Sequence, residues 1–400
     1  MTAMQLVATI YERTQDAAIA AIRALPPEHA MVEVRFDAFG GGDPAAFRDI
    51  TSKPIIFTNR GGEPVDADFG LIDVEFGRRI KHPSRTVLSF HDFEGMADLA
   101  PLIREMCAEG CAHTKIAVTP STLRENEELL AAIQPRLTMI GMGERGLYSR
   151  ILAPFFGSEL FFAGSAAPGQ LSLDRAIPIY GDRRVSKPEK IFAIAGNPAG
   201  HSLSPSIHNP LFRKAGVSAA YTIASFPTFG EIVEAFERGR IAGLSVTAPF
   251  KDDAFAFAQK AGAEIRPNAR EAEAVNTLVW IRGKVIADNT DVIGFQRLLP
   301  TAKRAAVVGA GGTARAALVA LRRAGIDATS FNRTPKSAAR PLDEIQNFDG
   351  DLIIDTLPSG VIVTVPKHIP VIAAAYDRGG LALLKEQAIP QNELFLEAFR

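Results

Sequence analysis

The chain has 400 residues, which is too long for one ordinary hydrophobic core and predicts two or three domains. Its formal net charge of -1, with 22% charged residues, excludes a strong overall field for nucleic acid or an anionic membrane. No basic region followed by an apolar core begins the sequence, and no apolar run approaches the length of a membrane span. The cysteines Cys107 and Cys111 have no His/Cys cluster beside them, so no metal site is expected. We expect a soluble, cytoplasmic protein.

Residues 1–173 read as short apolar strands at fairly regular intervals, and most are separated by segments compatible with helices, such as 16–25, 96–109 and 120–132. Eight strands with helical crossovers predict a closed parallel (β/α)8 barrel of the TIM type. The connection between Arg60 and Leu71 is too short for a helix, so the barrel should be shortened, with a loop in place of its third helix. The predicted strands are 5–10, 31–36, 54–58, 71–76, 86–90, 114–118, 137–141 and 160–163.

Polar residues stand in or after several of these strands, and in such barrels function lies at the strands' C-terminal ends. A lysine within the apolar strand "HTKIAV", Lys115, is costly unless it is used. Burial favours the neutral amine, which can attack a carbonyl, although an ion-paired or snorkelling lysine is the structural alternative. His91 in the neighbouring "SFHDF" favours catalysis, because a Schiff-base lysine beside a histidine acid/base can remove a proton next to a carbonyl. Three arginines at the same mouth indicate an anionic, carboxylate-bearing substrate, and these are Arg35, Arg60 and Arg150.

The motifs "VEVRFD", "IIFTNR", "SFHDF", "HTKIAV", "YSRILAPFFGS" and "AAPGQLS" occur in this order between residues 5 and 173, and together they resemble type I 3-dehydroquinate dehydratases. The resemblance implies that Lys115 forms an imine with the substrate ketone. It also implies that His91 removes the C2 proton and then protonates the departing hydroxyl, and that the dehydratase needs no cofactor. The substrate-binding residues that it implies are Glu33, Arg35, Arg60, Arg150 and Gln170.

One motif departs from the family pattern. The family has an arginine, three residues and then Glu-Gly-Gly, with the glutamate orienting the histidine, whereas "RGGEP" offers Glu63 one residue early. We take Glu63 as the candidate partner of His91. A short deletion that removed the orienting glutamate altogether would leave the same sequence.

The second half begins after a polar, proline-bearing segment, 176–190, that is typical of a linker. In "AAVVGAGGTARAALVALRRAG" a strand, a glycine turn and a helix follow in register, which favours a dinucleotide pyrophosphate at the helix N-terminus. The next strand ends in "TSFNRT", where a basic residue would accommodate the 2'-phosphate of NADP; Arg333 therefore predicts NADP(H) rather than NAD. The predicted cofactor-binding residues are Gly309, Gly311, Gly312, Thr313, Ala314, Asn332, Arg333 and Thr334.

"GNPAGHSLSPSIHN", "GLSVTAPFKDD", "EAVNTL" and "ADNTDVIGF", followed by "GAGGTAR", "NRT" and "IIDTLPSG", resemble the ordered motifs of shikimate dehydrogenases over nearly all of residues 190–400. The resemblance implies that Lys251 and Asp291 form the catalytic pair. This agrees with the chemistry, because a ketone that gains hydride at carbon needs a proton at oxygen. His201 and His208 are interpreted as structural. The resemblance assigns the substrate carboxylate to Ser202 and Ser204, and its hydroxyls to Thr247, Asn276 and Gln387.

The two resemblances predict a bifunctional shikimate-pathway fusion that converts 3-dehydroquinate to 3-dehydroshikimate and then to shikimate. Its expected parts are a barrel (1–175), a linker (176–190), a substrate-binding domain (191–297), a Rossmann NADP-binding domain (298–378) and a C-terminal helix that returns to the substrate domain (379–400). We expect small-molecule partners and neither nucleic acid nor membrane, and we leave a homo-oligomer open. Two alternatives remain: a dehydrogenase carrying a non-catalytic barrel as a scaffold or regulatory module, and an NAD-dependent catabolic quinate/shikimate dehydrogenase, which Arg333 disfavours.

Overall fold

The computed structural model describes residues 4–65, 67–181, 185–334 and 339–400. Its internal contacts divide the chain into two compact units. The first combines residues 1–191 with 198–227, and the second combines residues 192–197 with 228–400.

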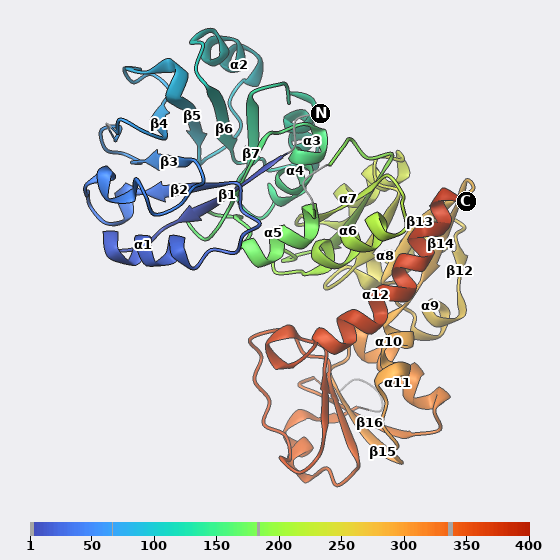
Figure 1. Cartoon of the computed structure of the whole chain (residues 1–400). Helices are drawn as coiled ribbons and strands as arrows, with labels where there is room; N and C mark the ends of the chain where they lie inside the picture. The colour runs from blue at the N-terminus through green and yellow to red at the C-terminus, as the bar shows by residue number, and fades with distance from the viewer. Residues whose placement is uncertain (1–3, 66, 182–184, 335–338) are drawn as a thin grey trace. The chain divides into compact units, whose positions relative to one another are not determined.

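The first unit contains an eight-stranded parallel sheet that curves into a nearly closed barrel (Figure 1). The strand order is β7-β6-β5-β4-β3-β2-β1-β8. The two end strands approach each other where the hydroxyl of Thr138 accepts a hydrogen bond of 3.2 Å from the backbone N–H of Leu160. The strands are β1 (Gln5–Ile10), β2 (Met31–Arg35), β3 (Ile55–Thr58), β4 (Leu71–Glu75), β5 (Thr86–Asp92), β6 (His113–Val118), β7 (Leu137–Gly141) and β8 (Leu160–Ala163), so all eight predicted strands are confirmed.

Helices α1 (Gln15–Arg23), α2 (Leu99–Ala108) and α3 (Leu123–Ala131) fall within the predicted helical segments or one residue beyond them. The side chain of Thr122 caps α3 by accepting a hydrogen bond from the backbone N–H of Glu125, whose carboxylate in turn accepts from the N–H of Thr122. The predicted loop in place of the third helix is confirmed, because the described residues between β3 and β4 form no helix. A cavity of about 570 Å³ lies against this loop and β4, and Glu63 and Ile72 are among the residues that line it.

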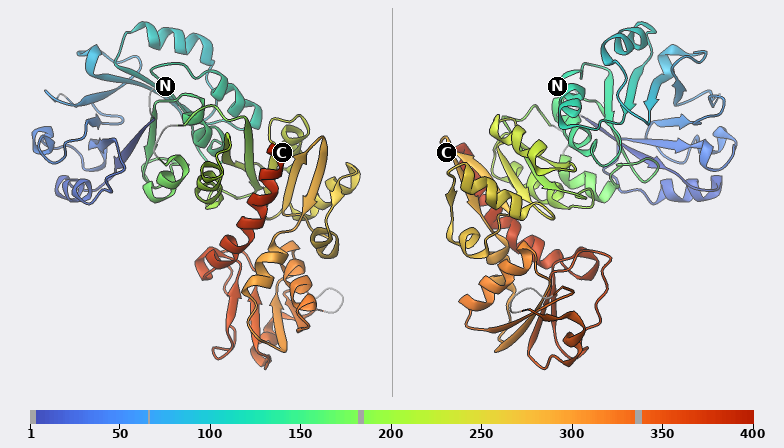
Figure 2. Two further views of the ribbon diagram at one scale, coloured as in Figure 1. Left: turned by 45° about the vertical axis from the view of Figure 1, so that its right-hand side comes forward. Right: turned by 180° about the vertical axis from the view of Figure 1, so that it is seen from behind.

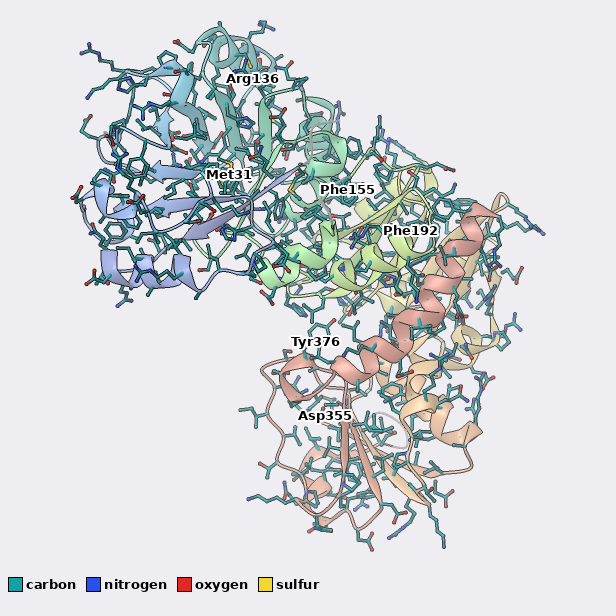
Figure 3. All side chains as sticks on the ribbon, viewed as in Figure 1. Met31, Arg136, Phe155, Phe192, Asp355 and Tyr376 are labelled. Atoms are coloured by element: carbon teal, nitrogen blue, oxygen red, sulfur yellow. The ribbon has the colours of Figure 1, made fainter. Side chains whose placement is uncertain are left out.

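Helix α5 (Leu173–Tyr180) extends into the segment that the sequence predicted to be a linker. Residues 176–180 are therefore helical, and α5 packs against α6 (Ser204–Lys214) within the first unit. Phe155, labelled in Figure 3, packs on Tyr180 of α5 with ring centroids 5.8 Å apart. The apolar positions of "LDRAIPIY" explain the helix, because Ala176, Ile179 and Tyr180 are buried. The interpretation of residues 176–180 as linker is wrong.

The second unit contains a mixed sheet and a parallel sheet. In the mixed sheet the order is β9-β11-β13-β14-β12, from β9 (Lys190–Gly196), β11 (Gly243–Val246), β13 (Thr277–Ile281), β14 (Lys284–Asp288) and β12 (Glu264–Ile265). Helix α12 (Leu381–Leu396) joins it through Gln391, whose amide donates to the hydroxyl of Thr277 at 2.8 Å and accepts from that of Ser245 at 2.7 Å.

The parallel sheet has the order β17-β16-β15-β18-β19, as in a Rossmann-like fold, and Figure 2 shows α11 beside it. Its central elements are β15 (Arg304–Val308), α11 (Gly312–Arg323) and β16 (Asp327–Asn332), flanked by β17 (Arg340–Pro341), β18 (Leu352–Asp355) and β19 (Val371–Ala373). The α/β fold class is therefore confirmed, whereas the predicted domain boundaries remain predictions. Among the described residues, no helix is long and apolar enough to span a membrane.

Candidate active sites

The barrel encloses a cavity of about 100 Å³ near the carboxyl ends of its strands. The structure brings seven of the eight sequence-predicted dehydratase residues to it: Glu33, Arg35, Arg60, His91, Lys115, Arg150 and Gln170. They come from strands or loops that are far apart in the sequence. They meet in space because parallel strands present their carboxyl ends at one edge of the barrel. The exception is Glu63.

Lys115 lies on β6 with a side chain that is only 4% exposed. Its Nζ is 2.7 Å from Oδ2 of Asp73 and 3.9 Å from Oε1 of Glu33, and it stands 4.8 Å above the centre of the Phe162 ring. The ion pair is also what a structural lysine would show. A catalytic role for Lys115 therefore depends on its sharing the cavity with His91.

Asp73 is a residue that the sequence interpretation missed. It lies on β4, and the hydroxyl of Ser89 donates to its Oδ1 at 2.7 Å. Burial alone would raise the pKa of the Asp73 carboxyl, but Lys115 and Arg60 hold that pKa far below its ordinary value. A signal was present in "LIDVE", where an acid inside an apolar strand is as costly as Lys115 is in its own strand.

The partner of His91 is Glu75, not Glu63. Nδ1 of His91 lies 3.0 Å from Oε2 and 3.2 Å from Oε1 of Glu75, which is the last residue of β4. Because a carboxylate only accepts hydrogen bonds, this contact favours a proton on Nδ1, with Nε2 as the basic nitrogen of the neutral ring. Nη1 of Arg60 also lies 3.3 Å from Nδ1, a longer contact than those with Glu75. Glu63 instead lines the cavity beside the loop that replaces the third helix, since the shortened connection carries it away from the strand ends.

Two of the three arginines are already paired with acids. Arg35 donates to Asp37 at 2.7 Å. Arg60 donates to Glu75 at 2.5 Å and to Asp73 at 3.2 Å. Arg150 is different, because it donates to backbone carbonyls, and burial lowers its pKa to about 10. Burial also lowers the pKa of His91 from its ordinary value, with Lys115 and Arg60 adding to this effect and Glu75 opposing it.

Glu33 and Gln170 meet at a hydroxyl that the sequence interpretation did not single out. The Thr9 hydroxyl donates to Glu33 Oε2 at 2.8 Å and accepts from Gln170 Nε2 at 2.9 Å. Thr58 donates to the other carboxylate oxygen of Glu33 at 2.9 Å. Both side chains are thereby fixed in the cavity wall.

In the second unit, Lys251 and Asp291 meet as predicted. Nζ of Lys251 lies 2.5 Å from Oδ2 of Asp291, although the residues are 40 positions apart. The side chain of Asn276 donates to the other oxygen of Asp291 at 2.9 Å. Gln387 joins the group through Thr290, whose hydroxyl lies 3.0 Å from Gln387 Oε1 and 3.0 Å from Asn276 Nδ2. Thr247 is held through its backbone N–H, which donates to the carbonyl of Ala195 at 2.9 Å.

The glycine turn runs from β15 into α11 as expected. Gly309 has φ +114°, and a Cβ on it would lie 2.4 Å from the Thr356 hydroxyl, so a side chain is excluded there. The hydroxyl of Thr313 accepts a hydrogen bond of 2.8 Å from Lys251 Nζ. Arg333 is exposed directly after β16, and Asn332 donates to the carbonyl of Thr334 at 3.0 Å. Gly311, Gly312 and Ala314 lie at the start of α11.

The polar loop before α6 belongs to the first unit. Ser202 and Ser204 are 3% and 2% exposed, and their hydroxyl oxygens are 3.1 Å apart. His208 is buried and stacks on Tyr221 with ring centroids 4.5 Å apart, in line with a structural role. His201 is exposed.

Comparisons with known proteins match both halves. Residues 63–186 match the model of type I 3-dehydroquinase, and residues 194–278 match that of the shikimate dehydrogenase substrate binding domain. The chain is 32% identical to the shikimate biosynthesis protein AroDE of Chlamydia pneumoniae, over 80% of this chain and 76% of that protein. The chain belongs to the bifunctional 3-dehydroquinate dehydratase/shikimate dehydrogenase family.

Two further relatives agree with this membership. The chloroplastic bifunctional 3-dehydroquinate dehydratase/shikimate dehydrogenase of Arabidopsis thaliana is 27% identical over 75% of this chain and 57% of its own length. A shikimate dehydrogenase (NADP(+)) of Acidiphilium cryptum (strain JF-5) is 33% identical over 50% of this chain and 88% of its own length. This member of the fusion family is thus an enzyme with a dehydratase half and a dehydrogenase half.

Proposed function

We propose that the barrel dehydrates 3-dehydroquinate through Lys115 and His91, and that the second half reduces the product, 3-dehydroshikimate, through Lys251 and Asp291. The observation that supports this most is the single cavity that Lys115 and His91 share with Glu33, Arg150 and Gln170. The chain would then catalyse two consecutive reactions, the first with Lys115 and His91 and the second with Lys251 and Asp291.

In the dehydratase step, Nζ of Lys115 attacks the ketone carbon and the carbonyl oxygen leaves as water, which forms the imine. Nζ must lose a proton first, and the imidazole of His91 is available as the base. The lowered pKa of His91 favours the neutral ring, and the Nδ1–H donated to Glu75 directs Nε2 toward the substrate. The ring passes the proton that it took from Nζ to the carbonyl oxygen as this leaves as water, which makes the ring neutral again. It then takes the C2 proton and returns it to the departing hydroxyl, and water hydrolyses the imine to release the product and free Lys115.

We assign substrate recognition to the cavity wall. Arg150 is the guanidinium best placed to bind the carboxylate, because it is bonded only to backbone carbonyls in the described contacts, whereas Arg35 and Arg60 are paired with acids. Glu33 and Gln170 are held by the Thr9 hydroxyl and can bind the substrate hydroxyls.

In the reduction step, Lys251 donates a proton to the ketone oxygen, and Asp291 holds the ammonium in position. NADPH, when bound, supplies the hydride to the ketone carbon. Asn276 fixes Asp291 from its other side, and Thr313 accepts a second hydrogen bond from Nζ, so the direction of the ammonium is restricted. Ser202 and Ser204 are assigned to the substrate carboxylate, and Thr247, Asn276 and Gln387 to its hydroxyls.

The residues of the Rossmann-like part fit NADP. The position of Gly309 excludes a side chain where the backbone must approach a pyrophosphate, and α11 begins at Gly312 directly behind it. The exposed Arg333 is free of acidic neighbours in sequence and can bind the 2'-phosphate. Its position favours NADP(H) over NAD and weighs against the catabolic quinate/shikimate dehydrogenase.

A coupled assay tests the proposal. Addition of 3-dehydroquinate and NADPH to the pure protein should consume the reduced nicotinamide absorbance. A protein whose barrel is only a scaffold would reduce added 3-dehydroshikimate but leave NADPH unchanged with 3-dehydroquinate. The cavity that Lys115 shares with His91 weighs against that alternative.

A further inference from the structure

A carboxylate of the dehydratase half binds the loop that precedes α6. Glu144 follows β7, and its Oε1 accepts hydrogen bonds from the backbone N–H groups of Ala199 and Gly200, each at 2.8 Å. The same oxygen accepts the hydroxyl of Ser225, the last residue of β10 (Ala219–Ser225), also at 2.8 Å. Burial would raise the pKa of Glu144, but these three donors keep it below its ordinary value, so the carboxylate is ionised at neutral pH.

An arginine of the same half binds the loop from its other side. Nη2 of Arg175, in α5, donates to the carbonyl of Gly200 at 2.9 Å and to that of Ser202 at 2.7 Å. The backbone carbonyl of Arg175 accepts the hydroxyl of Ser206 at 2.9 Å. One acidic side chain thus binds the N–H groups of Ala199 and Gly200, and one basic side chain binds the C=O groups of Gly200 and Ser202.

The fit around Gly200 is tight. A Cβ at this position would lie 3.1 Å from Cδ1 of Leu147 and 3.3 Å from Oε1 of Glu144. The loop therefore lies so close to Leu147 and Glu144 that any residue larger than glycine at position 200 would require these side chains to shift. The buried hydroxyls of Ser202 and Ser204, two and four residues after Gly200, lie within hydrogen-bonding distance of each other.

We propose that Glu144 and Arg175, although they belong to the dehydratase half, are positioning residues for the dehydrogenase. They hold the backbone of residues 199–202 so that Ser202 and Ser204 are preorganised to bind the substrate carboxylate. This inference rests on the role proposed above for the two serines. An anchor that must be ordered on binding loses affinity, whereas turnover is little affected, because a carboxylate anchor contacts the ground state and the transition state alike.

The test measures steady-state shikimate oxidation with NADP+ on the full chain. Glu144→Ala should raise the KM for shikimate roughly tenfold to a hundredfold, as expected for loss of a charge-assisted contact, with kcat within about threefold. Glu144→Gln should fall between Glu144→Ala and wild type, because its amide oxygen still accepts N–H bonds. Arg145→Ala is the matched control, since this neighbouring side chain donates to the Ser121 carbonyl instead. Dehydration of 3-dehydroquinate, measured on the same preparations, shows whether the barrel remains folded.

A double-mutant cycle with Ser202→Ala distinguishes the positioning role of Glu144 from the proposal that Ser202 binds the substrate carboxylate. If Glu144 acts through the serine, Glu144→Ala should raise the KM far less in the Ser202→Ala background. Amide hydrogen exchange at Ala199 and Gly200 should also be faster in Glu144→Ala. A Glu144→Ala variant with unchanged KM, beside a Ser202→Ala variant with a raised one, overturns the positioning role alone. An unchanged KM in Ser202→Ala overturns the serine anchor, and this inference with it.

Discussion

His91 and Glu75 form a pair across neighbouring strands, with Nδ1 of the imidazole 3.0 Å from Oε2 of the carboxylate. The motif that normally supplies such a carboxylate lies in the shortened loop after Arg60, and its only glutamate, Glu63, lines another cavity. A residue from β4 thus stands where a loop residue was expected. The pair favours the tautomer of the imidazole that carries its proton on Nδ1, and Glu75 raises the pKa of His91 against the effect of burial.

The pH profile of dehydration should identify the partner of His91. A base must be neutral, so kcat/KM falls as the pH falls through the pKa of His91, which lies below the ordinary value of 6.5. Glu75 opposes that lowering, so Glu75→Gln should move the acidic limb to still lower pH and reduce kcat about tenfold or more. Glu63→Gln is the control and should leave both unchanged. The reverse result would restore Glu63 as the partner.

Borohydride should trap the imine on Lys115. Reduction in the presence of 3-dehydroquinate or 3-dehydroshikimate should give a covalent adduct, detectable by mass spectrometry on the peptide that contains Lys115. Lys115→Ala should abolish both the adduct and dehydration, while shikimate oxidation stays near that of the wild type. An adduct on another lysine would reject the assignment.

Asp73 should stabilise the barrel as well as position Lys115. Asp73→Asn leaves a buried ammonium without its closest carboxylate, and removal of one partner of a buried pair costs about 3–5 kcal/mol of unfolding free energy. Urea denaturation measures this loss, and the double variant with Lys115→Met should recover part of it. The pKa of Asp73 is lowered in the folded state, so its contribution is present above the unfolded pKa of about 4 and is lost on acidification below it. Equal stability of wild type and Asp73→Asn would contradict the ion pair.

Arg333 should determine the cofactor preference. Its guanidinium can form charge-assisted hydrogen bonds with a 2'-phosphate, each worth about 1.5–3 kcal/mol, or roughly tenfold to a hundredfold in affinity. Arg333→Ala should therefore raise the KM for NADPH far more than that for NADH. Arg322→Ala, on the exposed surface of α11 where it pairs with Glu271, serves as the control. Equal use of both cofactors by the wild type would refute the prediction.

Lys251 and Asp291 should act as one unit in hydride transfer. A general acid contributes about 10²–10⁴-fold, so Lys251→Met should lower kcat by at least about a hundredfold. The double variant with Asp291→Asn should be little worse than the worse single variant, because each acts through the same hydrogen bond. Ser202→Ala provides the contrast, since loss of a ground-state anchor should mainly raise the KM. Near-normal turnover in Lys251→Met would show that this lysine only binds substrate.

The sequence predicted those parts of the fold that depend on local patterns. All eight barrel strands and the missing third helix follow from apolar runs and from the length of one connection. The pairing of His91 with Glu75 could not be predicted in the same way, because it depends on the register of β4 against β5. The helix α5 was not predicted because its segment is rich in polar residues and proline, and its apolar face is short. That face is buried, and α5 packs against α6, which begins more than twenty residues later in the sequence.

The helical junction limits how this protein could be divided. Because α5 packs on α6, and α4 (Leu147–Leu152) packs on β10, a gene split between the two enzymes would expose apolar faces on both products. A free-standing reductase made from residues 190–400 would have to acquire polar residues on α6 and β10, together with its own replacements for Glu144 and Arg175. The two enzymes are therefore not joined by a simple linker, because α4 and α5 of the dehydratase half pack on α6 and β10 of the dehydrogenase half. Separation of the genes would require coordinated substitutions in both groups of elements.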